Sequence, residues 1–135
     1  MSYLDPNAPE WTPLLEAAWR ARANAFAPYS HFQVGAALLR RGGQIVPGCN
    51  VENASYGGTI CAERNAVCAA VAQGMKVDEL EALAIVTESE TLTPPCGLCR
   101  QVLAEFGEDF PVLLANRNSR SLHRMSDLLP LAFSG

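Results

Sequence analysis

Three cysteines and one glutamate, in two short stretches of the chain, have the residue types and spacing of a metal site. The stretches are Cys61-Ala62-Glu63 and Pro95-Cys96-Gly97-Leu98-Cys99. Thiolates bind zinc well, and a zinc site with three protein ligands leaves its fourth tetrahedral position open to water, as catalytic sites do. The sequence therefore predicts one Zn²⁺ per subunit on Cys61, Cys96 and Cys99, with Glu63 beside the metal as the catalytic proton carrier rather than as a ligand.

Two helices are expected to position these residues. One spans about Cys61 to Gln73 and ends at Gly74, and the other spans 97–106 and ends at Gly107. The free N–H groups at a helix start lower thiol pKa values and stabilise thiolates. Three thiolates leave one surplus negative charge on zinc, and we expect the two helix starts and Arg64 to offset it. Arg64 is thus predicted to tune the metal.

The chemistry that such a site could perform is hydrolysis. Zinc lowers the pKa of bound water from about 15.7 toward about 7. Glu63 could take the water proton, pass it to a ring nitrogen and then help an amine to leave. Three Cys or His ligands, a glutamate that is not a ligand and a P-C-x-x-C run are similar to the pattern of nucleobase deaminases. The pattern favours removal of an amino group from a cytosine ring.

A closed structural zinc site is the main alternative. It would need Cys49 or Cys68 as a fourth ligand. Cys68 lies in the apolar run from Val67 to Ala72, where we expect it to be buried as a small hydrophobic residue. Cys49 ends a predicted strand near the site, so the sequence excludes it less firmly. His31 and His123 have no partner at ligand spacing, and we expect surface or turn positions for both.

Composition indicates one domain over residues 1–135, with residues 1–9 as a loose lead-in. The chain is 49% hydrophobic and 18% charged, which suits one compact core. No apolar run approaches the length needed to span a bilayer, and the first ten residues do not resemble a signal peptide. Five cysteines is an odd number, so we expect reduced thiols and a cytoplasmic location.

The charge pattern favours a small-molecule substrate over a nucleic acid. The formal net charge is −4, and the ten Lys and Arg residues are scattered instead of forming a basic face. A polynucleotide deaminase would need a basic channel and commonly has His at the position of Cys61. We therefore expect neither a nucleic-acid partner nor a membrane partner.

Periodicity predicts an α/β fold with a mixed five-stranded sheet covered by helices. Pro47 should place its strand at the edge of the sheet, where a missing N–H donor costs little. The expected helices are 10–26, 61–73, 97–106 and a turn at 127–129, and the expected strands are 33–40, 44–49, 83–87, 111–115 and 121–125.

Four separated motifs resemble the small homotetrameric cytidine deaminases that act on free nucleosides. The motifs span 27–38, 48–57, 61–64 and 95–101. The resemblance implies a three-layer α/β/α sandwich whose last two strands run antiparallel. It also implies hydrolysis of cytidine and 2′-deoxycytidine to uridine and 2′-deoxyuridine, with release of ammonia, in pyrimidine salvage. A deaminase of a modified nucleoside such as blasticidin S is the alternative substrate class.

The same resemblance implies substrate contacts that spacing does not assign. Phe32 would stack on the pyrimidine. Asn50 and Glu52 would bond the ribose 3′-hydroxyl, which argues for an ordinary nucleoside. Ala62 and Glu63 would hold the polar edge of the base.

Other implied residues would complete the site of a neighbouring subunit in the homotetramer. They are Tyr56, with the Ala54 backbone, and Phe133; packing of Phe133 within its own subunit is the alternative. Two positions depart from the family pattern: Pro94 stands where Ser is common, and Leu131 where Gly is common. We expect Pro94 to stiffen the wall beside the leaving amine.

Overall fold

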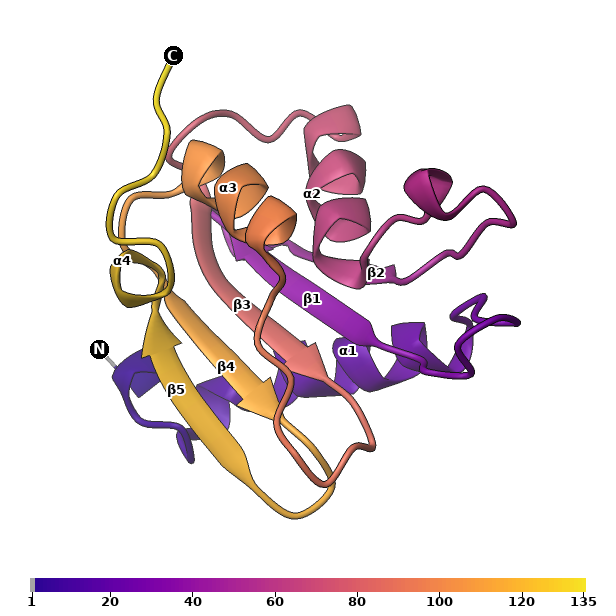
Figure 1. Cartoon of the computed structure of the whole chain (residues 1–135). Coiled ribbons are helices and arrows are strands. Elements are labelled where there is room, and N and C mark those ends of the chain that lie inside the picture. The colour runs from indigo at the N-terminus through magenta and orange to yellow at the C-terminus, as the bar shows by residue number, and fades with distance from the viewer. Residues whose placement is uncertain (1) are drawn as a thin grey trace.

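The computed structural model describes residues 2–135 and contains one mixed sheet between layers of helices (Figure 1). This architecture confirms the predicted five-stranded α/β/α sandwich. Short 3-10 turns span 2–4, 9–11 and 56–58. The helices are α1 (Thr12–Ala23), α2 (Ala62–Ala72), α3 (Gly97–Phe106) and α4 (Met125–Leu128), and the strands are β1 (Gly35–Arg40), β2 (Ile45–Cys49), β3 (Leu80–Val86), β4 (Pro111–Ala115) and β5 (Arg120–Arg124).

The strands lie in the order β2-β1-β3-β4-β5. β3 and β4 are parallel, and the other neighbouring pairs are antiparallel, including the last pair β4–β5 as expected. β2 is an edge strand in which Pro47 lies opposite Ala37, so the edge position inferred from the proline is confirmed. The connection from β3 to β4 runs through α3, since parallel strands need a crossover.

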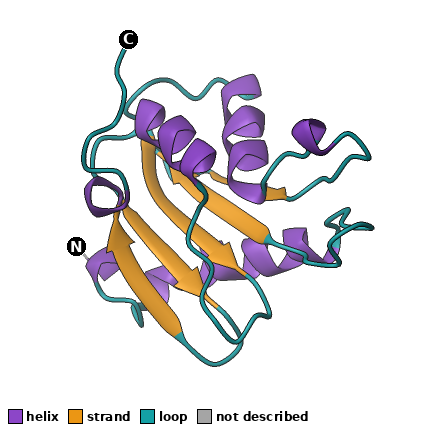
Figure 2. Cartoon of the chain, viewed as in Figure 1, coloured by secondary structure: helices purple, strands orange, loops and turns teal. Residues whose placement is uncertain are grey.

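Both faces of the sheet are buried, which explains the continuous apolar runs in its central strands. On one face, α1 packs Leu14 and Ala18 against the sheet together with Trp11. On the other face, α2 and α3 bury side chains that include Ala66 and Leu103. Figure 2 shows that α2 and α3 both begin near the end of the sheet where β3 ends. The two helix starts therefore converge on one end of the sheet.

The amino-terminal region differs from the sequence prediction. The helix is shorter than the expected 10–26, because Phe26 forms a bridge with Val51 and its N–H donates to a backbone carbonyl instead of continuing the helix. The expected loose lead-in is packed within residues 2–11: the ring of Tyr3 meets Trp11 edge-on, with centroids 5.1 Å apart. The Arg120 guanidinium also donates to the Pro6 carbonyl over 3.0 Å. No helix of residues 2–135 is long and apolar enough to cross a membrane.

Candidate metal centre and active site

The three predicted ligands meet at the convergent helix starts. Cys61 directly precedes α2, Cys96 directly precedes α3, and Cys99 lies in the first turn of α3. The Sγ atoms of Cys61 and Cys96 are 3.9 Å apart, and those of Cys96 and Cys99 are 3.5 Å apart. Zinc–sulfur bonds of about 2.3 Å in a tetrahedron put sulfurs about 3.8 Å from each other. The sulfurs are thus already spaced for zinc.

No fourth protein ligand joins this cluster among residues 2–135, in which the Cys, His, Asp and Glu side chains grouped for a metal are Cys61, Cys96 and Cys99. Cys49 lies outside the group, and burial raises the pKa of its thiol. Cys68 is also outside it. The expectation that Cys68 is buried is wrong: it lies on the exposed side of α2. The donor set therefore fits zinc with one position left for another ligand.

Arg64 lies against the sulfur cluster, as the charge argument expected. Its Nη2 donates to Cys61 Sγ over 3.8 Å and to the carbonyl of Thr59 over 3.3 Å. Hydrogen bonds from Cys99 and then from Arg64 lower the pKa of Cys61 to about 5, and the contact between the two thiols raises the pKa of Cys99. The site therefore favours a thiolate at Cys61 even before the other sulfurs lose their protons.

Glu63 is buried beside these sulfurs. It is the second residue of α2 and is only 5% exposed. Burial, with a further contribution from the charge of Cys61, raises the pKa of Glu63 to about 7. A carboxyl group that titrates near neutrality can both accept and release a proton during one reaction cycle.

A glycine on the neighbouring strand lets the first turn of α2 come close enough to place Glu63. A Cβ at Gly48 would lie 2.5 Å from the Ala62 carbonyl oxygen and 2.5 Å from the Ala66 nitrogen. Any side chain at position 48 would therefore push the helix away from β2. Asn65 adds a second tie, donating from Nδ2 to the Cys49 carbonyl over 2.8 Å.

A pocket of about 230 Å³ opens beside the sulfurs and gathers most of the predicted site. Five predicted residues are not among its lining residues: Ala54, Tyr56, Arg64, Cys99 and Phe133. Tyr56 instead borders an adjoining hollow, and Phe133 is on the carboxyl-terminal tail with 79% of its surface exposed. The lining residues are Ser30, Phe32, Val34, Asn50, Glu52, Thr59, Cys61, Ala62, Glu63, Ile85, Thr93, Pro94 and Cys96.

Asn50 and Glu52 build the pocket wall that carries Phe32. Asn50 Oδ1 accepts from the Val34 N–H over 2.8 Å, which explains why β1 begins later than predicted. Glu52 Oε1 accepts the N–H groups of Tyr29 and Ser30 at 2.9 and 3.1 Å, and the Ser30 hydroxyl donates to Oε2. The hydroxyl contact is the largest influence lowering the pKa of Glu52, so this side chain is a carboxylate.

Several lining residues were not singled out from the sequence. Ser30 and Val34 lie within the same motif as Phe32, and that proximity could have marked them. Ile85 lies inside a buried strand, and Thr93 in a loop with no motif of its own. Neither carries a local signal of a site, because only the folded sheet brings them to the cysteines.

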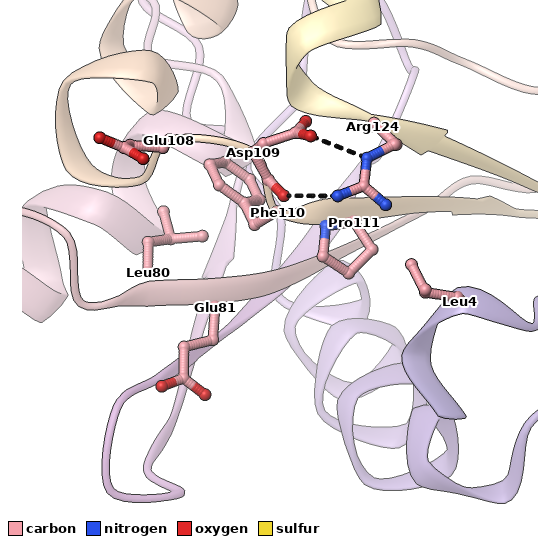
Figure 3. A pocket seen from close by; sticks show the side chains of 8 residues that line it. All are labelled: Leu4, Leu80, Glu81, Glu108, Asp109, Phe110, Pro111 and Arg124. Atoms are coloured by element: carbon pink, nitrogen blue, oxygen red, sulfur yellow. Dashed lines mark hydrogen bonds and ion pairs between the residues drawn. The ribbon is translucent and has the colours of Figure 1, made fainter. Parts of the chain in front are cut away.

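A second hollow, of about 390 Å³, lies around the start of β4 (Figure 3). Its lining includes the apolar Phe110 and Pro111 and the charged Asp109 and Arg124. These two charged groups pair with each other: Arg124 Nε lies 2.8 Å from Asp109 Oδ2. The sulfur cluster is not part of this hollow, so the cysteine pocket is the better candidate for chemistry.

Residues 11–114 match the family model described as the cytidine and deoxycytidylate deaminase zinc-binding region. The chain belongs to this deaminase family. The match includes Cys61, Cys96 and Cys99, so the predicted zinc-binding triad is confirmed in this deaminase.

Known members of the deaminase family are similar over most of their length. The chain is 48% identical over 124 residues to a cytidine deaminase of Mycobacterium tuberculosis, covering 92% of this chain and 90% of that protein. It is 46% identical over 123 residues to a cytidine deaminase of Halalkalibacterium halodurans, covering 90% and 92%. The crystal structure of a cytidine deaminase from Burkholderia pseudomallei superposes with a TM-score of 0.87 at 48% identity, covering 90% of this chain and 98% of that one.

Proposed function

We propose that this deaminase hydrolyses cytidine and 2′-deoxycytidine to uridine and 2′-deoxyuridine and releases ammonia, as an enzyme of pyrimidine salvage. The observation that carries the proposal is the pocket in which Glu63 lies buried beside three sulfurs spaced for zinc. The identities of 46–48% to cytidine deaminases support cytidine as the substrate.

The proton steps fall to Glu63. Zinc, which Cys61, Cys96 and Cys99 would hold, would act as a Lewis acid and lower the pKa of a water molecule toward about 7. Glu63 takes a proton from the attacking water and delivers it to ring nitrogen N3. It then passes the second water proton to the amine at C4, which leaves as ammonia, while the water oxygen becomes the new carbonyl oxygen. Glu63 returns to its starting state.

Substrate binding uses the wall built by segment 29–34. The ring of Phe32 lines the pocket and offers a face on which a pyrimidine can stack. The Asn50 side chain donates one N–H to the Phe32 carbonyl and accepts the Val34 N–H with one lone pair of its oxygen. One N–H and one lone pair of the amide are therefore left to bond a ribose hydroxyl. The Glu52 carboxylate also has lone pairs left. Ala62 and Glu63 lie where they can meet the polar edge of the base.

We also propose a homotetramer whose sites lie at subunit interfaces. Tyr56 and Phe133 are each 79% exposed, and Leu131 is 93% exposed, which leaves large apolar groups available to another copy of the chain. Gln101 holds the Phe133 backbone through two hydrogen bonds, of 2.8 and 3.2 Å. The tail is thus anchored while its aromatic ring faces solvent, which supports contact with a neighbour over packing within its own subunit. Ala54 is exposed on the same loop as Tyr56.

The direct test is an ultraviolet absorbance assay of cytidine conversion by the purified protein. We expect turnover of cytidine and 2′-deoxycytidine, loss of turnover after a strong chelator strips zinc, and recovery when zinc is returned. Parallel assays on free cytosine and blasticidin S decide the substrate class, since a blasticidin-S deaminase of Bacillus cereus is 29% identical over 107 residues. Turnover of blasticidin S without turnover of cytidine would overturn the proposal. The cytoplasmic location stays a prediction.

A further inference from the structure

The loop over residues 87–96 forms one wall of the proposed nucleoside pocket. It connects β3 to α3 and contains no helix or strand. Thr93, Pro94 and Cys96 from this loop line the pocket. A connection of this length needs contacts with the rest of the fold to keep its shape, because it has no backbone ladder of its own. Those contacts come mainly from the turn between β4 and β5, which lies beside the loop (Figure 1).

Asn116, the first residue of that turn, holds the loop with both hydrogens of its amide. Its Nδ2 donates to the carbonyl of Ser89 over 3.0 Å and to the carbonyl of Glu90 over 3.2 Å. The other end of the same amide is fixed as well: Oδ1 accepts from the N–H groups of Asn118 and Ser119 at 2.9 and 2.7 Å, and from the Ser119 hydroxyl. The turn therefore aims the NH₂ group of Asn116 at the loop.

Ionic and stacking contacts add a weaker tie at the same point. Arg117 Nη2 lies 3.2 Å from Glu88 Oε1, and its guanidinium stacks 3.6 Å from the ring centroid of Trp19. Arg22 Nη1 reaches the same carboxylate oxygen at 3.5 Å. Glu88 is half exposed, so these ion pairs contribute little by themselves.

The far end of the loop is held separately. Arg100 Nε donates to the Pro95 carbonyl over 2.7 Å, and Cys96 is fixed at the start of α3. The stretch 91–94 therefore lies between two anchored points, the carbonyls of Ser89 and Glu90 on one side and the carbonyl of Pro95 on the other. Within this stretch the Thr91 N–H donates to Ser89 Oγ over 3.3 Å, and the hydroxyls of Thr87 and Thr93 are 3.4 Å apart.

We infer that Asn116 is a positioning residue for substrate binding: it sets the place of Thr93 and Pro94 in the pocket wall through the carbonyls of Ser89 and Glu90. This inference rests on the proposed function. Thr93 and Pro94 carry no proton in the reaction, and Arg100 and α3 hold Cys96 independently of Asn116. A loosened wall therefore weakens binding in the ground state and the transition state alike, which raises KM and leaves kcat nearly unchanged.

The decisive variant is Asn116→Asp. Aspartate keeps the acceptors that the turn needs but loses both donors and sets a carboxylate against two carbonyl oxygens. Asn118→Asp is the matched control, because it adds the same charge two residues away, and the Asn118 side chain makes no hydrogen bond within residues 2–135. Asn116→Ser tests the same contact without new charge: its hydroxyl can still accept from the turn, but it does not reach the loop.

Two measurements on the zinc-loaded protein separate positioning from general stability: hydrogen exchange of peptides covering 87–95, and KM and kcat for cytidine. We expect faster exchange confined to that loop in Asn116→Asp and Asn116→Ser, with KM raised about fivefold and kcat changed less than about twofold. Asn118→Asp should match the wild type. Unchanged loop exchange overturns the inference, and so does faster exchange with an unchanged KM. A wild-type protein that does not turn over cytidine refutes the proposed function instead, and the exchange data still decide whether Asn116 holds the loop.

Discussion

Asn50 donates from Nδ2 to the backbone carbonyl of Phe32 over 2.8 Å, and its Oδ1 accepts from the backbone N–H of Val34 over 2.8 Å. A single side chain therefore fixes both the backbone beneath Phe32 and the start of β1. Asn50 is only 8% exposed, so its remaining hydrogen-bonding capacity faces the pocket or the protein. The residue that resemblance assigns to the ribose is also part of the scaffold that holds the base-stacking ring.

This double role predicts two effects of Asn50→Ala. The backbone groups of Phe32 and Val34 would lose partners in a part-buried place, so the free energy of unfolding should fall by about 2 kcal/mol. KM for cytidine should rise as well, because the wall carrying Phe32 loosens. Urea titration and steady-state kinetics measure the two effects, with Asn118→Ala as the exposed control. A free energy of unfolding and a KM that both equal those of the control would show that Asn50 does not hold the segment that carries Phe32.

Glu63→Gln should separate metal binding from proton transfer. The amide has nearly the shape of the carboxylate but cannot carry the proton, so kcat should fall about a thousandfold. Zinc content per chain should be unchanged, because Glu63 is not a ligand. Ammonia release and metal analysis measure the two quantities, with the exposed Glu81→Gln as control. Near-normal ammonia release by the variant would refute the assigned role.

Arg64→Ala tests the balance of charge around the thiolates. The guanidinium is 3.8 Å from Cys61 Sγ. Without it, only the partial positive charges of the two helix starts would offset the surplus negative charge of the thiolates. We expect turnover or zinc affinity to fall about 10- to 100-fold. A zinc titration against a competing chelator and steady-state kinetics measure both, beside Arg20→Ala on the exposed side of α1. If both quantities stay at the wild-type level, the role of Arg64 is rejected.

Phe133 offers a test of the proposed shared sites. If its ring completes a neighbour's pocket, Phe133→Ala should be nearly inactive yet folded, because the ring is exposed within its own chain. Co-expression with Glu63→Gln should then restore about a quarter of the wild-type turnover, since random assembly pairs intact Glu63 with an intact neighbouring Phe133 at that frequency. Each variant expressed alone is the control. Activity of the mixture no greater than the sum of the two controls would exclude action across the interface.

The metal site was predictable from local spacing, whereas the pocket around it was not. A helix start places Cys96 and Cys99 on one side, so the sequence motif itself carries that geometry. The walls depend on the sheet instead: Ile85 and Thr93 reach the site only because β3 ends beside the start of α2. The hydrogen bonds of Asn116 join residues 27 and 26 positions apart, which a local pattern does not reveal.

Two errors of the sequence prediction, the burial of Cys68 and the start of β3, also have physical causes. The eleven residues of α2 include so many small apolar side chains that the sequence does not distinguish its buried face from its exposed one, and Cys68 is on the exposed side. Strand β3 begins at Leu80, before the predicted start at Leu83. The prediction missed this start because the charged Glu81, which is exposed in the strand, interrupts the apolar run. Alternation of buried and exposed residues, rather than apolar content alone, identifies that start.

Zinc K-edge X-ray absorption on the purified protein tests the central claim most directly. We predict three sulfur neighbours at about 2.3 Å and one oxygen or nitrogen neighbour at about 2.0 Å, in a sample that deaminates cytidine. Four sulfurs around zinc, with Cys49 or Cys68 as the fourth, would contradict the open site. Full activity in a folded protein that contains no metal would contradict it equally.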